Sequence, residues 1–561
     1  MTSLPRLNTN LNGNDPSTSS TAIAMTNLTR NSSFSPLLSS PSSPSRSTPI
    51  DALPSPTTTS SSTPSRSSSR PSSSRTTLLL VLTASLSGLL FGYDTGIISS
   101  TLLHLESSFP LSTWDKSLIT SCTSLCALLA SPLAAPLADT LGRKRVILAS
   151  CIFFVVGAGV QACAQGVVGM VLGRSVVGLA VGGASATVPV YISEIAPAES
   201  RGRLVTVQSL FITGGQVVAY LVGWGTGVHW RWAVGLGALP ALVQGCLLGG
   251  LVESPRFLVM KGREEEAGRV LGGLQGVEDG REVVGRIKQE VAEMGKGGWR
   301  NAMRELLRVG GNRRALTIAC GLQGLQQLCG FNVLMYFSAT IFSLVGFSSP
   351  VTASLSIALT NFLATLVAFS LIDAIGRRRI LLLSIPFMVI GLVLCAVCFV
   401  YLPTDASHAS PSPSLSPAMV SRALEGWSLS SLPLALVVSL ILFVAAYALG
   451  MGCVPWQQSE LFPLQVRSLG SGLATATNWS SNFVVGISFL PMMETLGSPV
   501  TFGLYALVCV AGWFGVWGFY PETAGMELED VGELLADGWG VEGRGRGVGH
   551  VRVPTEEPDG A

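Results

Sequence analysis

Charged residues are scarce in this sequence. Asp, Glu, Lys and Arg make up 12% of the 561 residues, whereas soluble globular proteins carry about 25%. Hydrophobic residues account for 48%, and the mean hydropathy is +0.50. This composition excludes a soluble globular protein, and the net charge of +2 indicates no surface for nucleic acid. We expect an all-α membrane protein, because helices satisfy their own backbone groups in lipid.

The chemical motifs of enzymes are also lacking. The chain has no G-x-x-x-x-G-K-[ST] nucleotide loop and no nucleophile beside a base. Its 4 His do not cluster, and most of its 11 Cys lie inside apolar runs, as small buried hydrophobic side chains do. We therefore predict that the protein is not an enzyme and that it uses no metal and no cofactor.

Long apolar runs recur along the chain. A membrane-spanning helix needs about 20 predominantly apolar residues, and twelve runs qualify. Six lie on each side of a polar stretch; they cover 78–101, 116–137, 146–165, 168–190, 204–225 and 232–252, then 315–340, 350–373, 380–402, 432–455, 469–490 and 500–520. Small residues inside the runs let helices approach closely. The pattern predicts twelve transmembrane helices in two six-helix bundles.

The polar segments complete the expected domain organisation. The first 76 residues are mostly Ser, Thr and Pro, which predicts a disordered tail. The stretch between the bundles is rich in Glu, Lys and Arg at helical spacing, typical of amphipathic helices or of a solvated linker. The predicted parts are a tail 1–76, a first bundle 77–252, a helical linker 253–314, a second bundle 315–524 and a tail 525–561.

Two signatures occur once in each half, on short connections between apolar runs. D-x-x-G-R-[KR]-[KR] begins at Asp139 and again at Asp373. S-E-[LI]-x-P-x-x-x-R contains Glu194 and, in the second half, Glu460. The halves are therefore related, an architecture typical of transporters that rock one bundle against the other. A third echo closes each half, Glu253-Ser-Pro-Arg and Glu522-Thr-Ala-Gly.

The distribution of Lys and Arg predicts the orientation. With the N-terminus inside, 31 of the 35 Lys and Arg residues fall on cytosolic segments. A bias of this size decides topology. We expect both termini in the cytosol and a multi-pass protein of the plasma membrane.

Two charges lie within the predicted spans, Asp94 in the first and Arg174 in the fourth. At 1.5 Å per residue, Asp94 lies roughly 25 Å from the cytosolic side and Arg174 roughly 9 Å below the outer surface, so their depths agree. Paired with Arg, the carboxylate stays ionised; alone in an apolar site, it takes a proton. We interpret the pair as a proton-coupling device, which intramembrane ionisable residues favour over a static ion pair.

A second group of polar residues is neutral. Its densest part is in the seventh span, where Asn332 is out of phase with the other polar residues and we expect Gly330 and this Asn to break the helix locally. Amides donate and accept hydrogen bonds and so suit a ligand made of hydroxyl groups, and Trp offers an apolar face to a ring. The predicted substrate-binding residues are Gln216, Gln326, Gln327, Asn332, Tyr336, Asn361, Trp456 and Asn478. The alternative, hydrogen bonding between helices, is common for isolated amides.

Charged residues of the repeated signatures form a third candidate group at the span ends. Salt bridges between helices there are predicted to act as a cytosolic gate, in addition to anchoring the positive side. The gate residues are Asp139, Arg143, Glu194 and Arg201 in the first half and Asp373, Arg377, Glu460 and Arg467 in the second.

These motifs, in this order over roughly residues 77–530, resemble the sugar porter family of the major facilitator superfamily. The match includes Gly92-Tyr-Asp94, Gly173-Arg174, Gln326-Gln327…Asn332 and the doubled G-R-[KR]-[KR]. Val454-Pro-Trp456-Gln-Gln-Ser-Glu460 and Ala474-Thr-Ala-Thr-Asn478-Trp479 are similar to fungal myo-inositol/proton symporters. Asn478 stands where many hexose porters carry Gln.

The resemblance implies the major facilitator fold and import of a neutral polyol, myo-inositol, together with a proton. By position it implies proton coupling by Asp94 and Arg174. It also implies polyol binding by Gln216, Gln326, Gln327, Asn332, Asn361 and Trp456. Expected partners are the small polyol or sugar, the proton and membrane lipid, with no nucleic acid, and we expect a functional monomer. Open alternatives are a hexose symporter or uniporter of the same fold and a non-transporting nutrient sensor.

Overall fold

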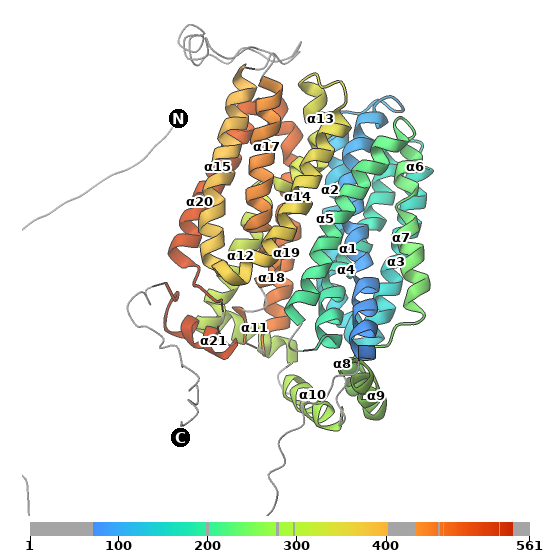
Figure 1. Ribbon diagram of the computed structural model, residues 1–561, viewed down its shortest axis with the longest axis vertical. Coiled ribbons are helices and arrows are strands. Elements are labelled where there is room, and N and C mark those ends of the chain that lie inside the picture. Colours follow the sequence, from blue (N-terminus) through green and yellow to red (C-terminus); the bar gives the residue numbers. More distant parts are fainter. Residues whose placement is uncertain are drawn as a thin grey trace, which may run out of the picture. The chain divides into compact units, whose positions relative to one another are not determined.

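The computed structural model of the protein describes residues 71–197, 201–275, 280–295, 298–401, 432–457, 461–463, 465–524, 526 and 528–541. All of these belong to one compact unit, Ser68–Ala561. The part of the chain described is helical and contains no strand (Figure 1). The predicted N-terminal tail up to residue 70 and the loop 402–431 lie outside the described residues.

The first half consists of six long helical segments. Five are continuous, and the sixth is divided by a turn at Leu236 and Gly237. They are α1 (Pro71–Leu105), α2 (Thr113–Leu141), α3 (Arg143–Ala162), α4 (Val167–Ile195), α5 (Arg201–Thr226) and the pair α6 (Trp230–Gly235) and α7 (Ala238–Leu248). Each predicted run coincides with one segment, although the helices extend beyond the apolar core into polar flanks.

The second half repeats this plan. Its helices are α12 (Gly310–Leu328) with α13 (Phe331–Leu344), α14 (Pro350–Ile375), α15 (Arg377–Tyr401), α17 (Leu432–Leu449) with the short η3 (Met451–Cys453) and α18 (Val454–Gln457), α19 (Arg467–Thr495) and α20 (Ser498–Phe519). Among the described residues, eleven helices are long and apolar enough to span a membrane. The twelfth, α19, has 29 residues but is less apolar because it carries Ser, Thr and Asn side chains.

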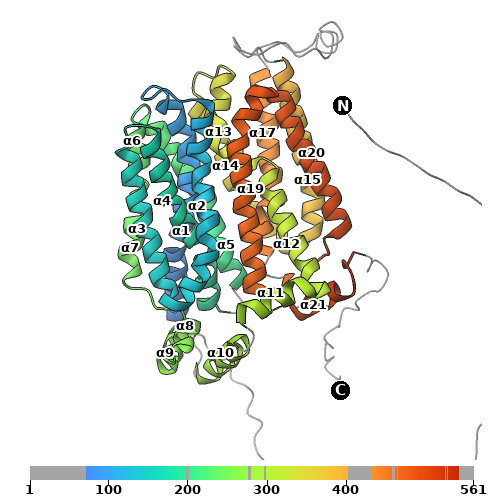
Figure 2. The ribbon, with the colours of Figure 1, turned by 180° about the vertical axis from the view of Figure 1, so that it is seen from behind.

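The main helix contacts of the two halves correspond, which gives the fold its pseudo-symmetry. In the first half α1 packs on α5, α2 on α4, and α3 on α4 and α7. In the second, α12 packs on α19, α14 on α17, and α15 on α17 and α20. The halves meet where α2 contacts α19, α5 contacts α14 and α1 contacts α13 (Figures 1 and 2).

Close helix packing in the first half depends on glycine. A Cβ on Gly92 of α1 would collide with the carbonyl of Ile212 in α5, and one on Gly215 of α5 with the carbonyl of Leu89. The two backbones therefore touch directly at this crossing. Small residues permit such an approach, and here they bring α5 against the helix that carries Asp94.

Four short helices connect the halves, and a fifth follows the last span. The first three connecting helices pack on one another. The second of them also contacts α1, where Thr77 Oγ1 donates to the carbonyl of Leu274 (3.1 Å). Arg314 of α12 donates to the carbonyls of Leu535 and Ala536 at the end of the fifth. These helices are α8 (Pro255–Met260), α9 (Glu264–Gln275), α10 (Gly280–Gly295), α11 (Gly298–Arg308) and α21 (Leu528–Asp537).

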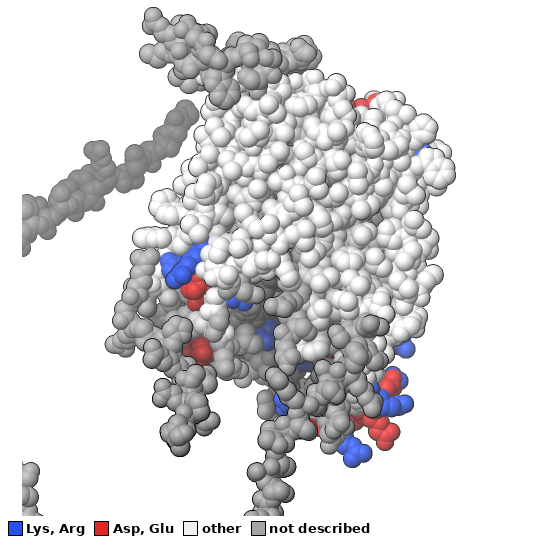
Figure 3. Space-filling model, viewed as in Figure 1, with Lys and Arg blue, Asp and Glu red and all other residues white. Residues whose placement is uncertain are grey.

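The helices α8 to α11 and the repeated signatures lie at one end of the bundles, here called the signature end; the other is called the far end (Figure 1). Charged side chains gather near the signature end in the face shown in Figure 3, and a broad band above it is uncharged. Such a band is what a lipid-facing surface requires. The chain is a multi-pass membrane protein.

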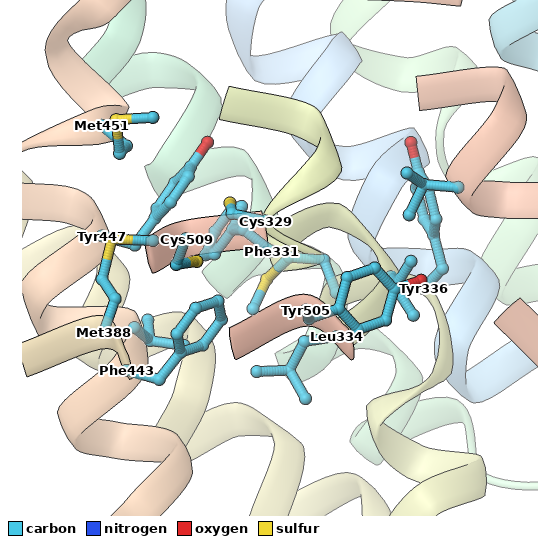
Figure 4. Close-up of a cluster of buried hydrophobic side chains, with 14 of the residues drawn as sticks. Cys329, Phe331, Leu334, Tyr336, Met388, Phe443, Tyr447, Met451, Tyr505 and Cys509 are labelled. Carbon is cyan, nitrogen blue, oxygen red and sulfur yellow. The ribbon is translucent and has the colours of Figure 1, made fainter. Parts of the chain in front are cut away.

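The hydrophobic core of the second half includes the residues at the junction of α12 and α13. Its side chains include stacked rings of Phe331 and Tyr447, whose centroids are 3.8 Å apart (Figure 4). Cys395 and Cys398 have C-x-x-C spacing, yet both are free, buried thiols on α15. The residues described contain no cluster of metal-ligating side chains.

Candidate functional site

Asp94 and Arg174 form a buried ion pair between α1 and α4. Arg174 Nη1 and Nη2 donate to the two carboxylate oxygens of Asp94 at 2.9 and 3.1 Å. The side chain of Arg174 is 1% exposed and that of Asp94 11%. A bidentate Arg–carboxylate pair, with two parallel hydrogen bonds, is the geometry that best retains both charges in a site of low dielectric. The structure therefore brings together the two residues whose depths matched in the sequence.

A break between α12 and α13 shapes the amide-rich part of the site. Gly330 has φ +87°, a left-handed conformation, and the ring of Tyr505 lies 3.0 Å from the position that its Cβ would take. Glycine adopts this conformation without steric cost. The break resets the helical phase, so that Asn332 donates to Gln327 Oε1 across it. The interruption expected from the sequence at Gly330 is confirmed.

Asn478 of α19 joins the amides of α12 into one network. Its Nδ2 donates to Gln323 Oε1 (2.6 Å) and Gln326 Oε1 (2.8 Å), and its Oδ1 accepts from Gln327 Nε2 (3.1 Å). Gln326 in turn donates to the carbonyl of Met451 (2.9 Å). Four amides thus present an array of donors and acceptors without any formal charge, which suits hydroxyl groups and not an ionic ligand.

Two further pairs extend this array. Tyr336 of α13 bonds to Asn482 of α19 at 3.2 Å, and Asn361 of α14 donates to Gln216 of α5 at 2.8 Å. The second pair crosses between the halves. Asn482 was missed by the sequence analysis, although it lies one turn beyond Asn478 and therefore on the same face of α19. The side chain of Trp456 lies outside the described residues.

The ion pair and the polar network of the second half come close to each other across the interface between the halves, where Tyr336, the partner of Asn482, interacts electrostatically with Arg174 and Asp94. Phe91, one turn before Asp94, contacts the indole of Trp479, the neighbour of Asn478; the ring centroids are 5.5 Å apart in an edge-to-face arrangement. Trp479 is 4% exposed. The ion pair therefore belongs to the first half, whereas the amides that bond to Asn478 belong to the second.

At the signature end, Arg143 is the centre of a charge cluster. It donates to both oxygens of Glu194 at 3.0 and 3.1 Å and pairs with Asp139 at 2.9 Å. Ser254 also donates to Glu194. These bonds connect α2, α3 and α4 of the same half.

The closing glutamates were noticed in the sequence only as an echo, and the structure shows what they contact. Glu253 accepts from the backbone amides of Arg143 and Lys144 at 3.1 and 3.3 Å, and Glu522 from those of Arg377 and Arg378 at 2.8 and 3.2 Å. Each carboxylate thus caps the N-terminus of the third helix of its half, where the helix dipole favours a negative charge.

The other predicted gate residues are only partly visible. Arg467 Nε donates to the carbonyl of Phe462 (3.2 Å). The side chains of Arg201, Asp373 and Glu460 lie outside the described residues. The role of these residues as a cytosolic gate therefore stays a prediction in both halves.

Comparisons with known proteins agree with this architecture. The profile of the "Sugar (and other) transporter" family matches residues 80–535. Myo-inositol transporter 1 of Candida albicans is 42% identical over 482 residues, covering 83% of this chain and 84% of the relative. Myo-inositol transporter 1 of Cryptococcus neoformans var. grubii is 41% identical over 475 residues, covering 82% of each.

Two solved structures with a similar fold are structures of the xylose transporter XylE. The major facilitator superfamily proton:xylose symporter XylE bound to 6-bromo-6-deoxy-D-glucose is 26% identical, with a TM-score of 0.66 over 82% of this chain and 99% of that one. XylE from E. coli in a partially occluded inward open conformation has the same TM-score at 24% identity, over 81% and 99%. The chain is therefore a transporter of the major facilitator fold and belongs to the sugar (and other) transporter family.

Proposed function

We propose that this chain imports myo-inositol together with a proton. The observation that carries the proposal is the buried Asp94–Arg174 pair of one half beside an uncharged amide array of the other. Relatives at 41–42% identity are named myo-inositol transporters, and a structural neighbour is named a proton:xylose symporter. A cyclic polyol has hydroxyl groups for the amides and no charge for the ion pair to bind.

The proposed cycle couples protonation of Asp94 to the movement of the halves. When the site faces the outside, Asp94 separates from Arg174 and takes a proton, and the polyol displaces water from Gln326, Gln327, Asn332 and Asn478. The halves then rock so that the site faces the cytosol. There Arg174 returns to Asp94, and the restored ion pair releases the proton. Gln216, Asn361, Tyr336 and Trp456 complete the substrate contacts in this proposal.

We assign the signature end to the cytosol of a plasma-membrane monomer with both termini inside. The excess of Lys and Arg on that side supports this orientation. In this scheme the cytosolic gate opens and closes by exchange of salt bridges. The residues that exchange them are Arg143, Glu194, Asp139 and Arg201 in the first half and Arg377, Glu460, Asp373 and Arg467 in the second.

Uptake of radiolabelled myo-inositol tests the function in cells that lack their own transporter. We expect accumulation above the external concentration at external pH 5.5 and weaker accumulation at pH 7.5 (on the order of a hundredfold difference in proton concentration drives the change). Competition by excess unlabelled glucose distinguishes a hexose porter. Absence of uptake at both pH values contradicts the proposal and favours a sensor, whereas uptake that only equilibrates indicates a uniporter.

A further inference from the structure

A chain of buried hydrogen bonds joins the two halves toward the far end. The first half contributes Tyr220 from α5 and Ser99 from α1. The second contributes one turn of α13, through Met335, Ser338 and Ala339. All five residues are 0% exposed. We call this set the far-end clasp.

The bonds of the clasp have one consistent direction. Tyr220 donates its hydroxyl hydrogen to the carbonyl of Met335 at 2.6 Å, so the 2.9 Å contact with Ser338 requires Ser338 to donate. Ser99 then donates to Ser338 at 3.2 Å and accepts from the amide of Ala339 at 3.0 Å. Every hydroxyl hydrogen is used once. No polar group of the clasp is left without a partner, as burial requires.

The clasp lies beyond the site on all three helices that form it. The helices α1, α5 and α12–α13 run from the signature end toward the far end (Figure 1). Ser99 follows Asp94 by five residues, Tyr220 follows Gln216 by four, and Ser338 follows Asn332 by six. These spacings correspond to roughly 6–9 Å along a helix. The clasp therefore stands between the site and the far end.

Apolar side chains from both halves surround the clasp. Tyr220 packs in one cluster with Ala339, Val351 and Ala358, and Leu103 is packed against that cluster. The clasp residues are themselves fully buried against this cluster. In this conformation the two halves are therefore in direct contact on the far-end side of the site.

The clasp also fixes the turn that carries a candidate substrate contact. Tyr336 follows Met335 directly, and its hydroxyl bonds to Asn482 within the site. The turn is thus held on one side by Tyr220 and Ser99 and on the other by the site itself. Opening the far end must break the first set of bonds and loosen the second.

We propose that Tyr220 and Ser99 are positioning residues that hold the far end closed and set the α13 turn for substrate binding. Their bonds form when the halves meet at the far end and are replaced by bonds to water when the halves part. Removing one hydroxyl favours the state that is open at the far end. The transport part of this inference rests on the proposed function, whereas the closure itself does not.

Labelling of a reporter cysteine tests the closure without any substrate. Leu103→Cys, placed in a Cys163→Ser background that removes an exposed thiol, is reacted from outside intact cells with a membrane-impermeant maleimide. In Tyr220→Phe and in Ser99→Ala we expect the labelling rate to rise about three- to tenfold, the effect of one buried hydrogen bond on an equilibrium. Thr101→Val is the matched control, because its buried hydroxyl bonds only to Ile97 of its own helix.

Equal labelling rates in all four proteins overturn the proposal. If Tyr220→Phe does not reach the membrane, Ser99→Ala decides alone. Myo-inositol uptake supplies a second readout. If the open state is favoured, both the external half-saturation constant and the maximal rate fall. A loss of folded protein lowers only the maximal rate. If the parent protein takes up no myo-inositol, the proposed function fails, and the labelling rates still decide the clasp.

Discussion

The two halves share one helix plan but contribute different chemistry to the site. The first half carries an ion pair that is almost completely removed from water, and the second carries neutral amides that satisfy one another. An ion pair in lipid is costly, and a protein retains it when its function needs a charge that can be cancelled. Amides bind hydroxyl groups without that cost. The difference suggests that duplication gave the scaffold and that each half then took one task, energy coupling or recognition.

The largest expected effect comes from breaking the charged side of this comparison. Asp94→Asn preserves the size of the side chain but cannot take up and release a proton. We expect accumulation of labelled myo-inositol to fall to a ratio of about 1 between inside and outside, because a carrier without a coupled ion only equilibrates its substrate. The measurement is the steady-state ratio at two external pH values.

Exchange of labelled for unlabelled substrate is the control for Asp94→Asn. It needs binding and rocking but no net proton movement, so we expect it to persist. Uphill accumulation with an unchanged response to pH would show that Asp94 is not the coupling group.

The neutral side is broken at its centre by Asn478→Leu. This substitution leaves Gln323, Gln326 and Gln327 each without one hydrogen-bond partner. We expect the half-saturation constant for myo-inositol to rise roughly tenfold or more, since a lost buried hydrogen bond costs about 1–3 kcal/mol. Proton coupling should persist, so accumulation at saturating substrate remains sensitive to pH.

Thr477→Val is the matched control for Asn478→Leu, because the hydroxyl of Thr477 bonds to Leu473 within α19. An unchanged half-saturation constant in Asn478→Leu, measured in the same assay, would place the polyol elsewhere.

The fold could be predicted well from the sequence because the same patterns occur in both halves. Twelve apolar runs and duplicated signatures each indicated two related halves, and the helices coincide with the runs. The ends of helices were less predictable: α1 begins at Pro71, inside the predicted tail, because a helix continues through polar residues once packing supports it.

The contacts within the site were only partly predictable. Residue type and depth indicated Asp94 with Arg174, because few partners exist for a charge in lipid. The sequence did not indicate which amides bond to which, since that depends on how α19 is rotated against α12. The same reason explains why Asn482 was missed and why Glu253 and Glu522 were recorded without a role.

A symmetric prediction tests whether the signature ends are equivalent in the two halves. Gly142 and Gly376 have φ of +102° and +97°, and a Cβ on either would lie 2.5 or 2.7 Å from the carboxylate of Glu253 or Glu522. A non-glycine residue in this region costs about 1–3 kcal/mol. We expect Gly142→Ala and Gly376→Ala to lower the thermal unfolding midpoint of the purified protein by similar amounts.

Gly159→Ala is the control, because Gly159 is on helix α3 with nothing within 4 Å of its Cβ position. It should leave the midpoint unchanged or raise it slightly, since alanine is the better helix former. If only one of the two signature glycines resists substitution, the capping arrangement is not equivalent in the two halves.

The smallest effect is expected from a tyrosine that lies next to the site without belonging to it. Tyr505 packs on Gly330, and its hydroxyl is buried without a hydrogen-bond partner within the described part of the chain (Figure 4). Tyr336 is buried equally well, but its hydroxyl bonds to Asn482. Tyr505→Phe should therefore leave thermal stability and myo-inositol uptake unchanged or slightly improved, because it removes a polar group that burial penalises.

Tyr336→Phe should raise the half-saturation constant several-fold, since it leaves the amide of Asn482 short of one partner. Equal effects of the two substitutions would mean that ring packing, and not the hydroxyl, is what the site requires at this depth.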